Sequence, residues 1–115
     1  MSFYVYHATS IENYRSICND GVIKSSFGVY FANKQDYAQA FCEMRNVFTL
    51  GDEFGVIKIR KDKLRKVYKN KFLLSHDHNP AFFPKDLRAF VCWEDVSLWD
   101  VDASCGTFRS VKKVA

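Results

Sequence analysis

Short apolar runs and helical spacings alternate in the N-terminal part of the chain. Residues 3–6 are aromatic and β-branched, which indicates a short buried strand that runs into His7. Ser10 is a residue type that caps helices, and Gly21 suits the left-handed position that ends one. Between them the apolar positions have helical spacing: Ile11, Tyr14, Ile17 and Cys18. The pattern predicts a strand, a helix and then a stub of strand at residues 22–23.

A second strand and a second helix follow the same plan. Residues 28–32 form an apolar run that begins with glycine, which predicts a strand. Asn33 is placed to cap a helix over residues 34–45. The apolar positions of that helix lie four and three residues apart: Tyr37, Phe41 and Met44. A loop at residues 24–27 separates this unit from the first.

The rest of the chain has the pattern of a sheet. Five apolar runs predict strands: residues 54–59, 72–74, 89–93, 96–101 and 107–114. Residues 76–84 hold two prolines, an asparagine and two histidines, so we expect a loop there. Two helices followed by a meander of strands are typical of the α+β class.

The composition fits one small domain. The chain has 115 residues, of which 48% are hydrophobic and 17% aromatic, so large rings can supply its core. These values exclude a disordered chain, and no apolar run reaches the ~20 residues of a membrane-spanning helix. The first residues lack the signal-peptide pattern, and four cysteines without a CxxC pair predict free thiols. We therefore expect a single domain over residues 1–115, in a reducing cytoplasm and away from membranes.

The positive charge is concentrated in one segment. Residues 58–71 carry eight of the seventeen basic side chains and a single acid, Asp62, while the other residues have a net negative charge. Such a segment could contact the phosphates of a nucleic acid or a nucleotide. The candidates for this contact are Lys58, Arg60, Lys61, Lys63, Arg65 and Lys66. The alternative, which the lack of interleaved aromatic residues favours, is a solvated edge strand and turn that lysines keep from pairing.

A histidine and a hydroxyl residue stand together at the first junction between strand and helix. Residues 7–10 read His-Ala-Thr-Ser, and at such a junction backbone groups and side chains can hold a ligand jointly. Tyr30, Tyr37 and Phe41 offer flat apolar surfaces for an aromatic ring. Each of these residues alone is typical of a core, and their joint order is what indicates a site.

This order of motifs resembles the ADP-ribosyltransferase superfamily, in its diphtheria-toxin-like and poly(ADP-ribose) polymerase-like branch of the His-Tyr type. Members of that branch have a strand ending in His-Gly-Thr/Ser, a helix, a Gly-hydrophobic stub and then Gly-Ile/Val-Tyr-Phe/Leu-Ala. This chain has Tyr-His-Ala-Thr-Ser at residues 6–10, Asp-Gly-Val-Ile at 20–23 and Gly-Val-Tyr-Phe-Ala at 28–32. The resemblance covers residues 3–45 well and the later strands more loosely. It implies an α+β domain with a split antiparallel sheet and two N-terminal helices.

The resemblance also implies a cleft for NAD⁺, which these proteins use as a substrate. His7 would donate a hydrogen bond to the ribose next to nicotinamide, and Thr9 would help to hold the ribose or the loop. The backbone of Ala8, which replaces the usual glycine, would pair with the carboxamide through its N–H and C=O. The full set that the resemblance assigns to binding is His7, Ala8, Thr9, Tyr30, Tyr37 and Phe41.

Aromatic rings and one acid would complete that cleft. Tyr30 would flank the nicotinamide, and the ring stacked on its other face would come from Tyr37 or Phe41. The family's glutamate would fall at residues 88–89, where this chain has arginine and alanine. Glu94 could replace it only if the register of that strand differs. The catalytic set implied by the resemblance is therefore His7, Tyr30 and Glu94.

These expectations favour an NAD-dependent mono-ADP-ribosyltransferase that modifies a protein or nucleic-acid acceptor, in the manner of a phage or bacterial effector. The alternative is an inactive domain of the same fold that binds and inhibits a partner protein. A minor alternative is an RNA 2′-phosphotransferase-like enzyme, which the tyrosine before His7 disfavours because that group has arginine there. His76, Asp77 and His78 do not predict a metal site, since zinc sites have four ligands at closer spacing.

Overall fold

Three helices and eight strands make up the part of the chain that the computed structural model describes, residues 3–76 and 84–111. The helices are α1 (Ile11–Asp20), α2 (Gln35–Met44) and α3 (Lys61–Tyr68), with the short 3₁₀ turns η1 (Lys69–Lys71) and η3 (Leu98–Asp100). The strands are β1 (Tyr4–Ser10), β2 (Val22–Ile23), β3 (Val29–Ala32), β4 (Glu53–Arg60), β5 (Phe72–Ser75), β6 (Ala89–Cys92), β7 (Val96–Ser97) and β8 (Ser104–Arg109). None of these helices is long and apolar enough to cross a membrane.

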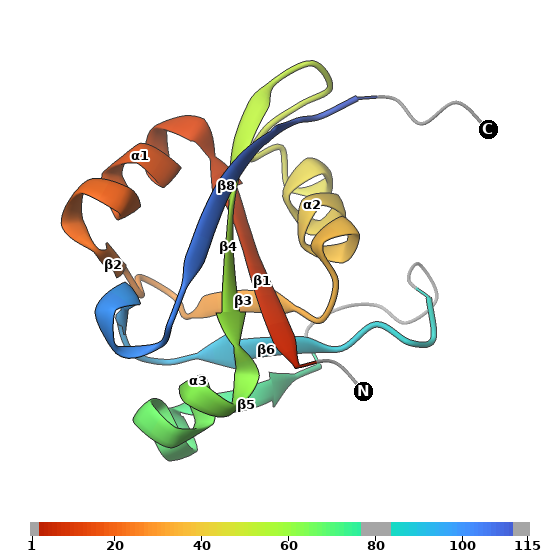
Figure 1. Cartoon of the computed structure of the whole chain (residues 1–115). Helices are drawn as coiled ribbons and strands as arrows, with labels where there is room; N and C mark the ends of the chain where they lie inside the picture. The colour runs from red at the N-terminus through yellow and green to blue at the C-terminus, as the bar shows by residue number, and fades with distance from the viewer. Residues whose placement is uncertain (1–2, 77–83, 112–115) are drawn as a thin grey trace.

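The main sheet consists of two three-stranded ladders that touch at one point. Its order is β5-β6-β3-β1-β4-β8, and every neighbouring pair is antiparallel. Strand β1 pairs with β4 along its whole length, from Tyr4 to Ser10, but pairs with β3 only at Tyr6 and Ala32. Figure 1 shows the result: β1, β4 and β8 run across the direction of β3, β6 and β5. The α+β class and the antiparallel sheet are thus confirmed.

Two hydrophobic cores lie on opposite faces of β1. Val5 belongs to the larger core, which packs α1 and α3 against the sheet. Ala8 belongs to the smaller core, where Ala38 of α2 packs with Phe54 of β4. Because side chains alternate along a strand, β1 supplies both cores at once. Figure 1 shows α1 and α2 on either side of this strand.

Helix α1 has the boundaries that the sequence predicts. The Ser10 side chain accepts a hydrogen bond from the backbone N–H of Asn13, at 3.2 Å. Gly21 ends the helix in the left-handed conformation, with φ of 73°, and its N–H donates to the Ile17 carbonyl at 2.7 Å. The Tyr14 ring of this helix lies directly over the backbone of β4 at Gly55, where a side chain would overlap it. These contacts fix α1 beside β1.

The basic segment forms helix α3, so the edge strand and turn favoured from the sequence are wrong. Leu64 and Tyr68, one helical turn apart, are both buried in the larger core. Asp62 in the first turn and the cations of the last turn suit the helix dipole. The chain therefore has three helices in its described part, one more than expected.

Three local expectations are also corrected. Asn33 does not cap α2; its side-chain N–H donates to the Asp86 carbonyl and its oxygen accepts from the Arg88 N–H, both at 2.9 Å. These bonds tie the start of α2 to the approach to β6. The strand expected over residues 96–101 is β7 followed by η3, and the strand expected over 107–114 begins earlier, as β8.

We predict that Gly55→Ala destabilises the protein by about 1–3 kcal/mol, because the new methyl group would displace the Tyr14 ring and with it α1. Gly106→Ala on neighbouring β8 is the matched control. Its methyl group would meet Phe108 at 3.4 Å, an ordinary contact distance, so we expect a change within about 0.5 kcal/mol. Urea unfolding of both variants measures the difference, and equal stabilities would contradict the packing of Tyr14 on β4.

Candidate functional site

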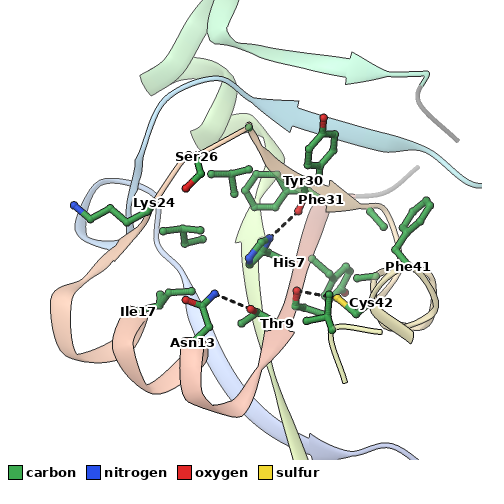
Figure 2. Close-up of a pocket in the computed structure, with 18 of the residues that line it drawn as sticks. His7, Thr9, Asn13, Ile17, Lys24, Ser26, Tyr30, Phe31, Phe41 and Cys42 are labelled. Atoms are coloured by element: carbon green, nitrogen blue, oxygen red, sulfur yellow. Dashed lines mark hydrogen bonds between the residues drawn. The ribbon is translucent and has the colours of Figure 1, made fainter. Parts of the chain in front are cut away.

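A cavity of about 360 Å³ opens where β1 and β3 separate. This volume lies within the range of roughly 300–1,000 Å³ that is usual for small-molecule sites. Its walls come from β1, α1, β3 and α2, together with the loop between β2 and β3. Figure 2 shows His7 in the middle, with Asn13 and Ile17 of α1 on one side and Phe41 and Cys42 of α2 on the other.

His7 spans the gap between the two ladders. Its Nδ1 lies 2.8 Å from the Tyr30 carbonyl oxygen (Figure 2), and since a carbonyl only accepts, Nδ1 carries the proton. Its ring centroid lies 5.8 Å from that of Phe31, which is buried beneath it. Burial lowers the pKa of His7 below its ordinary value, and this outweighs the opposing effect of the bond to Tyr30.

The protonation of Nδ1 determines what the other ring nitrogen can do. In a neutral imidazole with Nδ1–H, Nε2 has a lone pair and accepts a hydrogen bond. Within the described residues His7 makes no other hydrogen bond, so this acceptor is available to a ligand in the cavity. In this arrangement Nε2 can accept a hydrogen bond from a ligand, whereas the resemblance implies that His7 donates one to a ribose hydroxyl.

The aromatic ring next to His7 is that of Phe31, which the sequence reasoning did not assign to the site. Side chains alternate along β3, so Phe31 and Tyr30 point to opposite faces. Tyr30 lines the cavity and supplies the carbonyl for His7, but its ring lies under the guanidinium of Arg45, at 5.5 Å. Because neighbouring residues of a strand point to opposite faces, one of Tyr30 and Phe31 faces the His7 ring and the other faces away. The sequence alone does not show which of the two faces meets His7.

The Ala8 carbonyl faces the cavity but already has a donor. The thiol of Cys42, one of four free cysteines, donates to this oxygen with Sγ 3.1 Å away. Burial raises the pKa of Cys42 to about 11, so it remains a protonated donor at neutral pH. The N–H and C=O of a strand residue point to the same side. Ala8 can therefore offer its N–H to a ligand, whereas use of its carbonyl requires the thiol to move.

Thr9 and Asn13 close the α1 side of the cavity. Thr9 is buried, and its hydroxyl oxygen accepts from the Asn13 side-chain amide at 2.7 Å. Both residues line the cavity (Figure 2). The bond to Asn13 does not use the hydroxyl proton of Thr9, so this proton can be donated to a ligand.

Of the two candidate stacking rings on α2, only Phe41 lines the cavity. Tyr37 lies outside it, and its hydroxyl donates to Asp86, which also pairs with Lys34 at 2.7 Å. These contacts lower the pKa of Asp86, the bond to Lys34 being the main cause. Tyr37 therefore anchors α2 to the segment before β6, and of the two rings Phe41 is the one at the cavity wall.

The structure does not bring Glu94 to the cavity. Glu94 is exposed in the turn between β6 and β7 and is not part of the wall. Ala89 does line the cavity, at the position where the resemblance places a glutamate. The carboxylate among the lining residues is Asp20, which is exposed at the end of α1.

The cationic residues of the wall outnumber this single acid. Lys24 lies beyond β2, with its ammonium 3.8 Å from the Asp95 carboxylate, and Arg45 follows α2. Figure 2 shows the end of Lys24 directed away from His7. Because Lys24 is paired with Asp95, Arg45 is the cation of the wall that an anionic group of a ligand could meet.

The remaining sequence candidates lie elsewhere. None of the six cations proposed for phosphate contact lines this cavity. Asp77 and His78 lie outside the described residues, and residues 3–76 and 84–111 contain no cluster of three or more histidine, cysteine or acidic side chains able to hold a metal ion. The cavity is thus a largely apolar site in which His7 and a few other polar groups face a ligand.

Comparison of the chain with protein-family models, with curated proteins and with solved structures finds no match. The function therefore has to be inferred from the geometry of the cavity. Three properties of that geometry bear on it: an available imidazole acceptor, a backbone edge left open between two ladders, and Arg45 at the rim.

We predict that the wild-type protein loses more stability on acidification than His7→Gln does. The folded-state pKa of His7 is below that of the unfolded chain, so unfolding takes up a proton and stability falls as pH drops through the unfolded value of 6.5. Each pKa unit by which folding lowers the value of His7 contributes about 1.4 kcal/mol to this loss of stability. Urea unfolding from about pH 8 to about pH 5, the range in which an ordinary histidine titrates, measures it. Parallel curves would contradict a buried, neutral His7.

Proposed function

We propose that the chain has an ADP-ribosyltransferase-like fold, binds NAD⁺ in the cavity and transfers a single ADP-ribose to a macromolecular acceptor. The observation that carries this proposal is the position of His7. Its imidazole is bonded to the Tyr30 carbonyl where the sheet splits, and it leaves Nε2 facing an open cavity. The motif order of residues 3–45 supports the same family, and the crossing of two three-stranded ladders agrees with its split sheet.

The residues of the wall match the parts of the nicotinamide half of NAD⁺. A ribose hydroxyl would donate to Nε2 of His7, and the Thr9 hydroxyl would donate to another sugar oxygen. The Ala8 N–H would donate to the carboxamide oxygen, with the nicotinamide ring against Phe41. Arg45 at the rim would attract the pyrophosphate, because guanidinium groups bind phosphate oxygens well.

The chemistry would be cleavage of the bond between C1′ of that ribose and the nicotinamide nitrogen. Nicotinamide leaves with the bonding electrons, and a nucleophilic atom of the acceptor forms the new bond to C1′ and loses its proton. Positive charge develops on the sugar, so a carboxylate beside it speeds the reaction. Asp20 is the carboxylate that the wall supplies, and its exposed place at the rim favours slow transfer of one unit.

A second candidate function rests on Ala89. Because the cavity wall has a methyl group where a transferase of this family has its glutamate, the domain could bind a nucleotide or a partner protein without turnover. Release of nicotinamide separates the two functions, since a binding domain leaves NAD⁺ intact.

We predict saturable binding of NAD⁺ by the wild-type protein in calorimetry, and about tenfold weaker binding by His7→Ala, which loses one hydrogen bond and the contact of a half-buried ring. Tyr37→Phe is the matched control: it removes a hydroxyl on the same side of the domain but outside the cavity, so its affinity should equal that of the wild type.

The same samples report turnover. Nicotinamide release by the wild type that is lost in His7→Ala supports the transferase, with water as the nucleophile when no acceptor is added. Saturable binding with no release, both without and with an added nucleic-acid or protein acceptor, supports the binding domain. Absence of binding at millimolar NAD⁺, or equal affinities of wild type and His7→Ala, would refute the proposed site.

A further inference from the structure

The cations of α3 and η1 are divided between paired and unpaired groups. Arg60 forms a two-pronged ion pair with Asp62, with bonds of 2.9 and 3.1 Å. Lys63 lies 3.7 Å from the Asp102 carboxylate. Four others are exposed and make no ion pair within the described residues, and we call them the α3–η1 basic surface: Arg65, Lys66, Lys69 and Lys71. Protein carboxylates do not neutralise this surface.

Trp93 connects the α3–η1 basic surface to the cavity. Its backbone N–H donates to the Lys71 carbonyl at 2.9 Å, which fixes the residue beside η1. Its indole packs against the backbone of Gly28: a Cβ built on that glycine would lie 3.2 Å from Cζ3. Gly28 itself lines the cavity. Half of Trp93 remains exposed, which leaves a large aromatic surface beside η1 and Gly28.

The unpaired cations and the exposed indole together indicate the chemical class of the partner. Unpaired lysine and arginine side chains replace the counterions of a phosphate backbone, and an exposed ring stacks on an unpaired base of any sequence. An acidic polypeptide would satisfy the cations but has no group that requires the indole. Glu94 and Asp95 follow Trp93 and are exposed, so phosphates are repelled from that side and confined to the side of Lys71.

We propose that this surface binds a single-stranded nucleic acid, with phosphates on the α3–η1 basic surface and a base stacked on Trp93. The strand would thereby present its next nucleotide to the cavity mouth, which makes nucleic acid the acceptor class. The acceptor role rests on the proposed function, whereas the binding surface does not depend on it.

The charge contribution can be tested with fluorescein-labelled oligothymidylate, by anisotropy at several salt concentrations. Arg65→Ala combined with Lys71→Ala should weaken binding at least tenfold and make the slope of log K against log salt shallower by about 1.4, for two lost contacts to a single strand. Arg15→Ala combined with Lys85→Ala removes the same charges from other exposed positions and should leave binding within twofold of wild type. Equal losses in the two variants would overturn the proposal.

The stacking contribution can be tested in a Trp99→Phe background, where Trp93 is the one remaining tryptophan. Oligothymidylate should quench its fluorescence, and polyglutamate at equal charge should not. Trp93→Ala should weaken oligothymidylate binding about tenfold, the effect of one stacked base. Equal quenching by polyglutamate, or tighter binding of it, would assign the surface to an acidic protein and overturn the proposal.

NAD⁺ calorimetry on the Arg65/Lys71 variant separates this inference from the proposed function. Neither residue lines the cavity, so NAD⁺ affinity should be that of the wild type. If oligothymidylate binds and NAD⁺ does not, the nucleic-acid surface stands and the transferase fails. If NAD⁺ binds and oligothymidylate does not, the transferase stands and nucleic acid is refuted as its acceptor.

Discussion

The single pairing of Tyr6 with Ala32 is the constraint on which the rest of the structure depends. It joins two three-stranded ladders at one point and leaves them free to diverge on either side. Beyond it, β1 keeps its full pairing with β4, so the strand stays rigid while its other edge is open. A longer ladder between β1 and β3 would close the cavity. Without this pair, the ladder of β5, β6 and β3 would have no backbone pairing to the ladder of β1, β4 and β8.

An open strand edge inside a protein leaves backbone polar groups without partners, which is costly unless other groups satisfy them. Here side chains do so on both strands. The His7 imidazole donates to the Tyr30 carbonyl of β3, and the Cys42 thiol donates to the Ala8 carbonyl of β1. Burial raises the pKa of Cys42, which keeps its thiol a donor, and lowers the pKa of His7, which favours the neutral ring with its proton on Nδ1 and an unprotonated Nε2. The groups that stabilise the split also form the wall of the site.

The sequence predicts the N-terminal elements well because their signals are local. The cap at Ser10 and the left-handed Gly21 depend on a few neighbouring residues, and both are present. It fails at α3, where abundant charge conceals the one-turn spacing of Leu64 and Tyr68. The face of β3 that meets His7 depends on how two ladders cross, a tertiary property that no local pattern records. For the same reason, the sequence does not show that Phe41 lies in the cavity wall and Tyr37 outside it.

The most direct test of the central claim, that His7 is a neutral acceptor facing a ligand site, is the ¹⁵N NMR spectrum of its imidazole with and without NAD⁺. We predict a protonated Nδ1 and an unprotonated Nε2 at neutral pH, with the Nε2 resonance alone moving strongly when NAD⁺ is added. A protonated Nε2 in the free protein, or an Nε2 resonance that saturating NAD⁺ leaves in place, would contradict the account.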